Sequence, residues 1–86
     1  MRVSEITPAK IETRRVGVRF PSRDGLMAAA VRLLMERNLD CHVGEDDPTD
    51  PRRYEIWVDE IELNASYVMG AIERELGVMA FNEWER

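Results

Sequence analysis

The chain has 86 residues, of which 44% are hydrophobic and 34% are charged, and its formal net charge is −5. This composition is typical of one small folded domain and excludes an intrinsically disordered chain. The acidic balance disfavours direct binding to nucleic acid or to an anionic membrane surface, because both carry negative charge.

Residues 1–10 precede the first patterned segment and contain Pro8, which interrupts helices and strands. We therefore expect a flexible lead over residues 1–10 and a single domain over residues 11–86. The first strand is predicted in RRVGVRF, residues 14–20, where apolar residues alternate with a period of two. One side of this strand carries Val16, Val18 and Phe20, and the other carries Arg15, Gly17 and Arg19.

A helix is predicted between Pro21, which ends the first strand, and Asn38. Ser22 or Asp24 is suited to cap its first turn, and Asn38 is suited to end it in a left-handed conformation. At about 100° per residue, one arc of this helix is apolar and is expected to face the core. The members of this arc are Leu26, Met27, Ala30, Leu33 and Leu34.

Two strands follow, separated by the loop EDDPTDP, which is rich in Asp and Pro. The segment LDCHVG predicts a short strand with Cys41 on the core side and His42 on the other side. The segment RRYEIWVD, residues 52–59, predicts a further strand. One side of it carries Tyr54, Ile56 and Val58, and the other carries Glu55, Trp57 and Asp59.

The second helix is predicted in ELNASYVMGAIEREL, with Gly77 as its C-cap. Its apolar stripe consists of Ile61, Ala65, Val68, Met69, Ile72 and Leu76. The last strand is predicted in VMAFNEW, with Val78 and Ala80 on the core side and Met79 and Phe81 on the other side.

The predicted order of elements is strand, helix, strand, strand, helix, strand. This is the order of the α+β ferredoxin-like βαββαβ sandwich, a four-stranded antiparallel sheet with two helices on one face. We expect the strand order 4-1-3-2, in which the first and third strands are central.

The sheet face opposite the helices has no predicted element to cover it, yet it carries large apolar side chains. Gly17 is expected to leave a hollow beside Trp57, Met79 and Phe81. Large exposed apolar patches usually mark interaction surfaces, where Trp and Phe are favoured. We therefore predict a protein-interaction site formed by Arg15, Gly17, Arg19, Trp57, Met79 and Phe81. The alternative is that residues 1–10 fold across the same patch.

No segment carries a recognisable catalytic or metal-binding motif. Cys41 and His42 are adjacent in a predicted strand, so their side chains point to opposite faces and form a poor nucleophile pair. The run GEDDPTD lacks the residue order and the closing Glu of a calcium loop. The glycines are isolated, and no Gly-x-Ser-x-Gly sequence occurs. We therefore predict no enzymatic activity, no metal and no cofactor.

The single cysteine cannot form an internal disulfide, which fits a reducing compartment. The N-terminal sequence has no apolar run of the kind found in signal peptides. The longest apolar stretch is GLMAAAV, whereas a membrane-spanning helix needs about 20 apolar residues. We expect a cytoplasmic protein without a membrane segment.

The segment VRFPSRDGLMAAAVRLLMERNLDCHV resembles the opening strand, loop and helix of ACT-type regulatory domains. Its Asp24, Gly25 and Leu26 match the acidic-Gly-Leu turn of that family, and Asn38 matches the Asn that follows the helix. The chain departs from the family in having Asp24 where ACT domains usually have Pro. It also has Asn38 where their helix often ends in Gly. The resemblance implies small-molecule binding at a dimer interface near Asp24 and Gly25.

Together these patterns predict a small, acidic, non-enzymatic protein-interaction or regulatory module. It would use the open sheet face to bind a protein partner, or its own copy as a homodimer. One alternative is an inhibitor of phage or mobile-element type that binds a basic, nucleic-acid-binding protein. Another alternative is an ACT-like domain that senses a small molecule.

Overall fold

The computed structural model describes residues 11–85, so the predicted flexible lead over residues 1–10 lies outside the described residues. The elements are β1 (Arg14–Arg19), α1 (Leu26–Arg37), β2 (His42–Val43), β3 (Glu55–Glu60), α2 (Glu62–Leu76) and β4 (Phe81–Asn82). The strands form one antiparallel sheet in the order β2-β3-β1-β4. The predicted α+β architecture, with four antiparallel strands and two helices, is therefore confirmed. Read from the β4 edge, the strand order is the expected 4-1-3-2.

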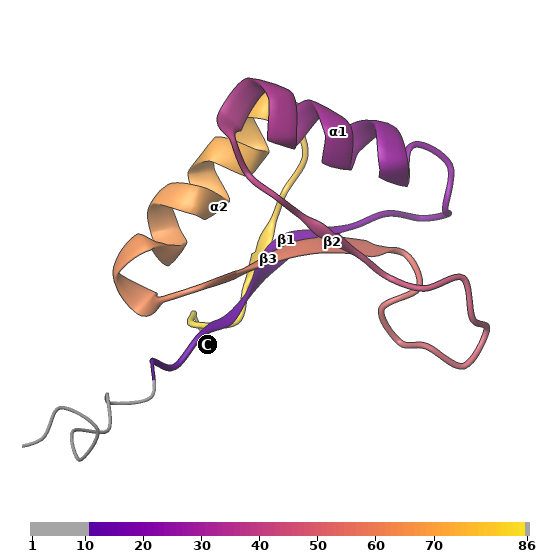
Figure 1. Cartoon of the computed structure of the whole chain (residues 1–86), viewed down its shortest axis with the longest axis horizontal. Helices are drawn as coiled ribbons and strands as arrows, with labels where there is room; N and C mark the ends of the chain where they lie inside the picture. The colour runs from indigo at the N-terminus through magenta and orange to yellow at the C-terminus, as the bar shows by residue number, and fades with distance from the viewer. Residues whose placement is uncertain (1–10, 86) are drawn as a thin grey trace, which may run out of the picture.

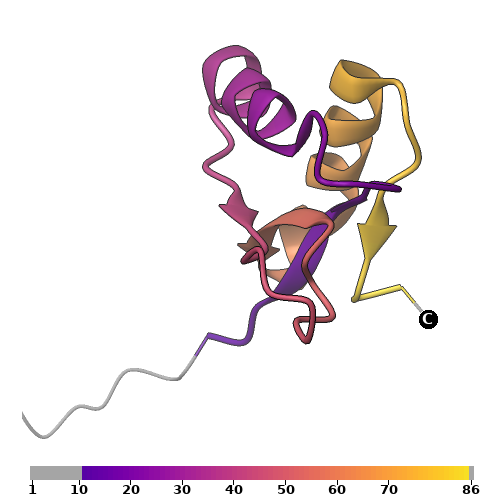
Figure 2. The same cartoon turned by 90° about the vertical axis from the view of Figure 1, so that its right-hand side faces the viewer.

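The centre of the sheet is the pair of β1 and β3, which are six residues long and aligned over their whole length. Val16 lies opposite Val58, and Val18 lies opposite Ile56. Both helices lie on the same side of the sheet, as Figures 1 and 2 show from two directions. The apolar side chains of β1 and β3 therefore pack against the helices. The largest fully buried side chains are Leu26, Leu33, Ile56, Ile72, Val16 and Val18.

The edge strands β2 and β4 are only two residues long, which is shorter than the segments predicted for them. Beyond β2, the backbone N–H of Gly44 still donates to the carbonyl of Glu55 at 3.0 Å, and then the chain turns into the loop that precedes β3. Before β4, the N–H of Ala80 donates to the Glu73 carboxylate of α2 at 3.0 Å. This hydrogen bond ties Ala80 to the helix, so the pairing with β1 begins only at Phe81.

The orientation of α1 differs from the predicted one. Leu26, Ala30 and Leu33 are buried as expected, but Met27 and Leu34 are exposed, and Ala29 is buried in their place. The sequence MAAAVRLLM is apolar around most of the helix, so the pattern does not select one face.

Ion pairs help to fix the rotation of α1. Arg32 and Arg37 both donate to the Glu75 carboxylate of α2, at 2.7 Å and 2.9 Å. These contacts turn one side of α1 toward α2. Hydrogen bonds from the two guanidinium groups hold the pKa of Glu75 below its usual value, so the carboxylate is charged at neutral pH.

The start of α1 also differs from the prediction, while its end is as predicted. Neither Ser22 nor Asp24 caps the helix; the N-cap is Gly25, with φ 82°, and it makes no side-chain cap hydrogen bond. A left-handed residue at this position is favourable for Gly, which has no Cβ. At the other end, Asn38 is left-handed with φ 56°, and the N–H of Leu39 donates back to the carbonyl of Leu33.

None of the helices between residues 11 and 85 is long and apolar enough to cross a membrane.

Candidate functional site: the open face of the sheet

The face of the sheet that points away from the helices, called the open face below, is covered by no helix or strand of the described chain (Figure 2). Its centre lies where three strands meet, because Gly17 of β1 is opposite Trp57 of β3 on one side and Phe81 of β4 on the other. Trp57 and Phe81 are both half-buried. The structure therefore brings these two predicted aromatic residues to neighbouring positions across Gly17.

The hollow predicted at Gly17 does not exist. A Cβ atom added at Gly17 would collide with the carbonyl oxygen of Ile56 and would lie 2.7 Å from both Cα and Cβ of Trp57. The space above Gly17 is therefore filled by the backbone and side chain of β3. Gly17 is required because β1 and β3 approach each other closely here.

Met79 is the one predicted member of the site that lies outside the sheet. It was expected on the open face because it alternates with Phe81 along a strand. However, β4 begins only at Phe81, and Met79 lies in the preceding connection with its side chain 88% exposed. The other predicted members, Arg15, Gly17, Arg19, Trp57 and Phe81, come from the three adjacent strands β1, β3 and β4.

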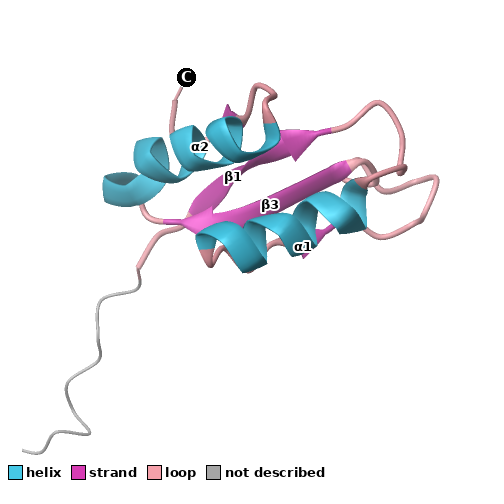
Figure 3. Cartoon of the chain, turned by 90° about the horizontal axis from the view of Figure 1, so that it is seen from above, coloured by secondary structure: helices cyan, strands magenta, loops and turns pink. Residues whose placement is uncertain are grey.

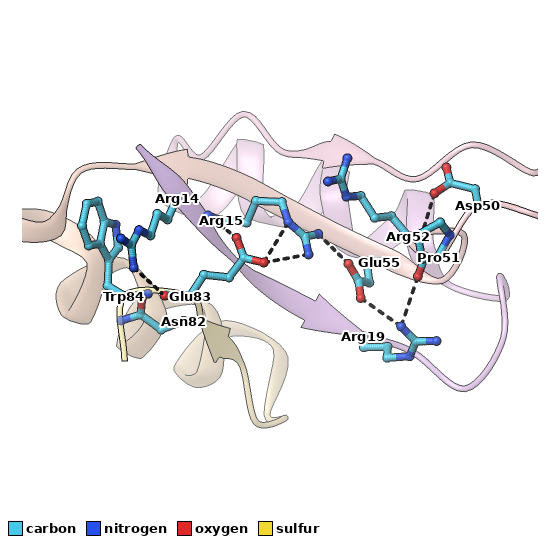
Figure 4. Close-up of polar contacts among 10 residues, drawn as sticks. All are labelled: Arg14, Arg15, Arg19, Asp50, Pro51, Arg52, Glu55, Asn82, Glu83 and Trp84. Atoms are coloured by element: carbon cyan, nitrogen blue, oxygen red, sulfur yellow. Dashed lines mark hydrogen bonds and ion pairs between the residues drawn. The ribbon is translucent and has the colours of Figure 1, made fainter. Parts of the chain in front are cut away.

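A buried carboxylate organises the arginines of the open face (Figure 4). The side chain of Glu55 is only 10% exposed. Nη1 of Arg15 donates to its Oε1 at 2.6 Å, and Nη1 of Arg19 donates to its Oε2 at 3.0 Å. Burying a carboxylate is unfavourable unless cations and hydrogen bonds compensate it. The two arginines of β1 supply this compensation from one side of the strand.

A second carboxylate, that of Glu83, binds Arg15 after the end of β4. Its Oε1 accepts the backbone N–H of Arg15 at 3.0 Å, and its Oε2 accepts Nη2 of the same residue at 2.9 Å. The Arg15 guanidinium therefore lies between Glu55 and Glu83 (Figure 4). It is held in one position by β3 and by the C-terminal segment together.

Both members of the pair between Arg15 and Glu83 stay charged at neutral pH. Burial by itself lowers the pKa of Arg15, but hydrogen bonds to Glu55 and Glu83 outweigh it and raise the pKa above its ordinary value. Burial by itself raises the pKa of Glu83, but hydrogen bonds from the backbone and side chain of Arg15 outweigh it, so the pKa is lowered.

Arginines also contact the aromatic rings of the open face. The Arg15 guanidinium carbon lies 5.2 Å from the ring centroid of Trp57 and 5.2 Å from that of Phe81. The guanidinium carbon of Arg52, in the loop before β3, lies 5.7 Å from the Trp57 centroid. Among residues 11–85, Arg52 forms no ion pair. Such contacts between cations and aromatic rings are attractive within about 6 Å of the centroid.

Trp84 fixes the C-terminal segment to the end of the sheet where β1 begins and β3 ends. Its indole Nε1–H donates to the carbonyl of Glu60 at 2.9 Å, and the guanidinium carbon of Arg14 lies 4.4 Å from its ring centroid. The roles of Glu83 and Trp84 were not predicted from the sequence. The available signal was the placement of Arg and Glu on the outward positions of the sheet, but it does not identify which pairs form.

Cys41 and His42 lie on opposite sides of the sheet, as predicted. Cys41 packs against the core, while the ring of His42 lies 5.7 Å from that of Trp57 and its Nε2 is 3.2 Å from Oδ2 of Asp59. Burial raises the pKa of the Cys41 thiol to about 11, with a further contribution from the negative charge of Asp40. The pair is thus not arranged for nucleophilic catalysis.

We expect Cys41 to react slowly with iodoacetamide in the folded protein. At pH 7–8 only a very small fraction of a thiol with a pKa of about 11 is ionised, and the thiolate is the reactive species. The measurement is the alkylation rate followed by mass spectrometry, with the urea-unfolded chain as the control. The rate in the folded protein should keep rising toward pH 11. A native rate equal to the unfolded rate at pH 7 would contradict this environment for Cys41.

No described protein family, no curated protein and no solved structure matches the chain.

Proposed function

We propose that this protein is a non-enzymatic interaction module of ferredoxin-like topology that binds a protein partner through its open face. The observation that supports this proposal most directly is the placement of two half-buried aromatic rings, Trp57 and Phe81, on a sheet face that no described helix covers. The central residues of protein interfaces are enriched in Trp, Tyr, Phe and Arg.

The composition of the open face favours a partner with carboxylates beside apolar side chains. The guanidinium groups of Arg19 and Arg52 are at the surface, and Arg19 is 59% exposed while it contacts Glu55. Arginine binds carboxylates with geometric specificity, because its planar group donates two parallel hydrogen bonds. An apolar side chain of the partner would then cover Trp57. Since Arg15 is already held by two carboxylates, little ordering is required on binding.

The alternative of an inhibitor that covers a basic protein receives less support, because the carboxylates of Glu55 and Glu83 on the open face are already paired with Arg15 and Arg19. The ACT-like alternative depends on a small-molecule site near Asp24 and Gly25. No pocket was found in the described part of the chain, so we do not prefer this alternative. The location that we propose is cytoplasmic, since the single cysteine, Cys41, cannot form an internal disulfide.

The test is to replace Trp57 by Ala and to measure the affinity for a partner captured by the wild-type protein. Truncating a large aromatic residue at the centre of an interface often reduces the binding free energy by at least about 2 kcal/mol. This loss raises the dissociation constant about 30-fold. The matched control is Tyr67→Ala, since Tyr67 is a 73% exposed aromatic residue on α2, away from the open face.

We expect Trp57→Ala to weaken binding and Tyr67→Ala to leave it unchanged, with similar melting temperatures for both variants. An equal affinity for the wild type and Trp57→Ala would refute the proposal. If Trp57→Ala instead unfolds the domain, the less disruptive Arg52→Glu tests the same surface. It reverses the charge of an exposed side chain that makes no ion pair within residues 11–85.

A further inference from the structure

His42 is the only histidine of the chain, and its side chain lies on the open face beside Trp57. In the register of β2 and β3, His42 is directly opposite Trp57. The two ring centroids are 5.7 Å apart, and the ring planes are inclined by 32°. Both helices lie on the other side of the sheet, which Figure 3 shows from above, so neither of them covers the imidazole. His42 therefore borders the aromatic residue to which we assign the main role in partner binding.

The carboxylate of Asp59 orients the imidazole of His42. Nε2 of His42 lies 3.2 Å from Oδ2 of Asp59, and the two side chains are 59% and 48% exposed. Asp59 is the second residue after Trp57 in β3, so it projects from the same side of the strand. The contact is a hydrogen bond while the imidazole is neutral with its hydrogen on Nε2, and it becomes an ion pair when the imidazole is protonated. Since both side chains are accessible to water, a proton reaches His42 without any opening of the structure.

Four charged side chains of different segments define the electrostatic surroundings of His42 and Trp57. They are Arg15 of β1, the exposed Asp40 two positions before His42, Arg52 of the loop before β3, and Asp59 of β3. Carboxylates ordinarily change their charge below about pH 5 and guanidinium groups above about pH 12, whereas histidine does so between about pH 5 and 8. Near neutral pH, the charge of this surface therefore changes at His42.

A protonated His42 adds a third cation to the Trp57 ring. The guanidinium carbons of Arg15 and Arg52 already lie 5.2 Å and 5.7 Å from the centroid of this ring. An imidazolium beside them increases the attraction for carboxylates of a partner, which we placed next to the apolar side chain that covers Trp57. The neutral imidazole lacks this attraction.

We propose that His42 makes partner binding through the open face dependent on pH, with a higher affinity at about pH 6 than at about pH 8. This inference rests on the function proposed above and adds a means of regulation to the same surface. Because one exposed pair of charges contributes little, we expect the dissociation constant to be only about two- to fivefold lower at the acidic pH. The effect should decrease at high salt, which screens exposed charges.

The first test needs no partner and follows the two indole N–H signals of the ¹⁵N-labelled protein by NMR between about pH 8 and 5.5. The Trp57 signal should shift as His42 is protonated, and this shift should be lost in His42→Gln. Trp84 is the internal control, because its Nε1–H is bonded to the carbonyl of Glu60 and its ring contacts a guanidinium group, that of Arg14, instead of an imidazole. A Trp57 signal that shifts equally in His42→Gln, or not at all, would overturn the proposal.

The second test measures the dissociation constant of the purified partner, captured by the wild-type protein, at about pH 8 and about pH 6. The ratio of the two constants should be about two- to fivefold larger for the wild type than for His42→Gln. The matched control is the double variant His42→Gln with Tyr67→His, which again has one histidine, at a 73% exposed position of α2, and should not regain the pH dependence. Titration of the partner contributes equally for all three proteins, so the differences isolate His42. Thermal melts establish that each variant is folded.

The outcomes separate this inference from the proposed function. If Trp57→Ala weakens binding but the wild type and His42→Gln show the same pH dependence, the open face is the binding surface and regulation by His42 is overturned. If Trp57→Ala leaves the affinity unchanged, the proposed function fails and the regulation fails with it.

Discussion

Replacing Leu33 by Ala should lower the free energy of unfolding by about 2–5 kcal/mol, the range observed when a large buried side chain is truncated. The Leu33 side chain is 0% exposed and lies in the core between α1 and the sheet. Its removal loses apolar burial and leaves a cavity that the surrounding helices fill only in part. A domain of this size is stable by roughly 4–13 kcal/mol, so this single change removes a large share of that stability.

The matched control is the adjacent residue Leu34 of α1, which is 44% exposed. Leu34→Ala removes the same atoms from a partly solvated position, so its effect should be clearly smaller. Urea unfolding followed by circular dichroism measures the free energy of unfolding of both variants. Equal losses of stability for the two variants would show that α1 is rotated from the orientation described here.

Gly17→Ala should lower the free energy of unfolding by about 1–3 kcal/mol, the usual effect of forcing extra atoms into a packed site. The added methyl group would meet the carbonyl oxygen of Ile56 and the backbone of Trp57, which cannot move without separating β1 from β3. The same shift would displace Trp57 on the open face. We therefore expect Gly17→Ala to weaken partner binding as well as stability.

Gly70 offers the control for Gly17. A Cβ atom at Gly70 would lie 3.1 Å from Nη1 of Arg74, which is the end of a flexible side chain. Since Ala is favoured over Gly inside a helix by about 1 kcal/mol, Gly70→Ala should be neutral or stabilising. Thermal and urea unfolding of both variants give the comparison. If Gly17→Ala proves as stable as the wild type, β1 and β3 do not approach each other as closely at Gly17 as the structure indicates.

Sequence periodicity was sufficient to predict the sheet, because β1 and β3 are strictly alternating. Val16, Val18, Ile56 and Val58 were assigned to the helix-covered side, and all are buried there. A period of two leaves no ambiguity about which side a residue faces. The strand order followed from the order of elements and from the handedness of the crossovers.

The face of α1 could not be predicted in the same way. Apolar residues occupy most positions from Met27 to Met35, so several rotations bury a similar apolar area. The rotation depends on contacts with α2, such as those of Glu75, and these are not local in the sequence. The wrong predictions for Met27 and Leu34, which are exposed, have this same origin.

The open face was located from the sequence, but its chemistry was not. The alternation placed Arg15, Glu55 and Trp57 on one side of the sheet without indicating which of them touch. The pairing of Arg15 with Glu55 depends on the register between β1 and β3, and its pairing with Glu83 depends on the path of the chain after β4. The space at Gly17 was misjudged because a missing side chain can bring strands together as well as leave a gap.

The central position of β1 has a consequence for how the domain folds. Both of its neighbours, β3 and β4, come from later parts of the chain, and Arg15 meets Glu83 across 68 positions. Among the strands of residues 11–85, β2 and β3 are the only sequential neighbours that pair directly. The chain must therefore close two long loops, at an entropic cost, before β1 gains its hydrogen bonds. Such a high contact order slows the search for the native state, even though each helix can form locally and rapidly.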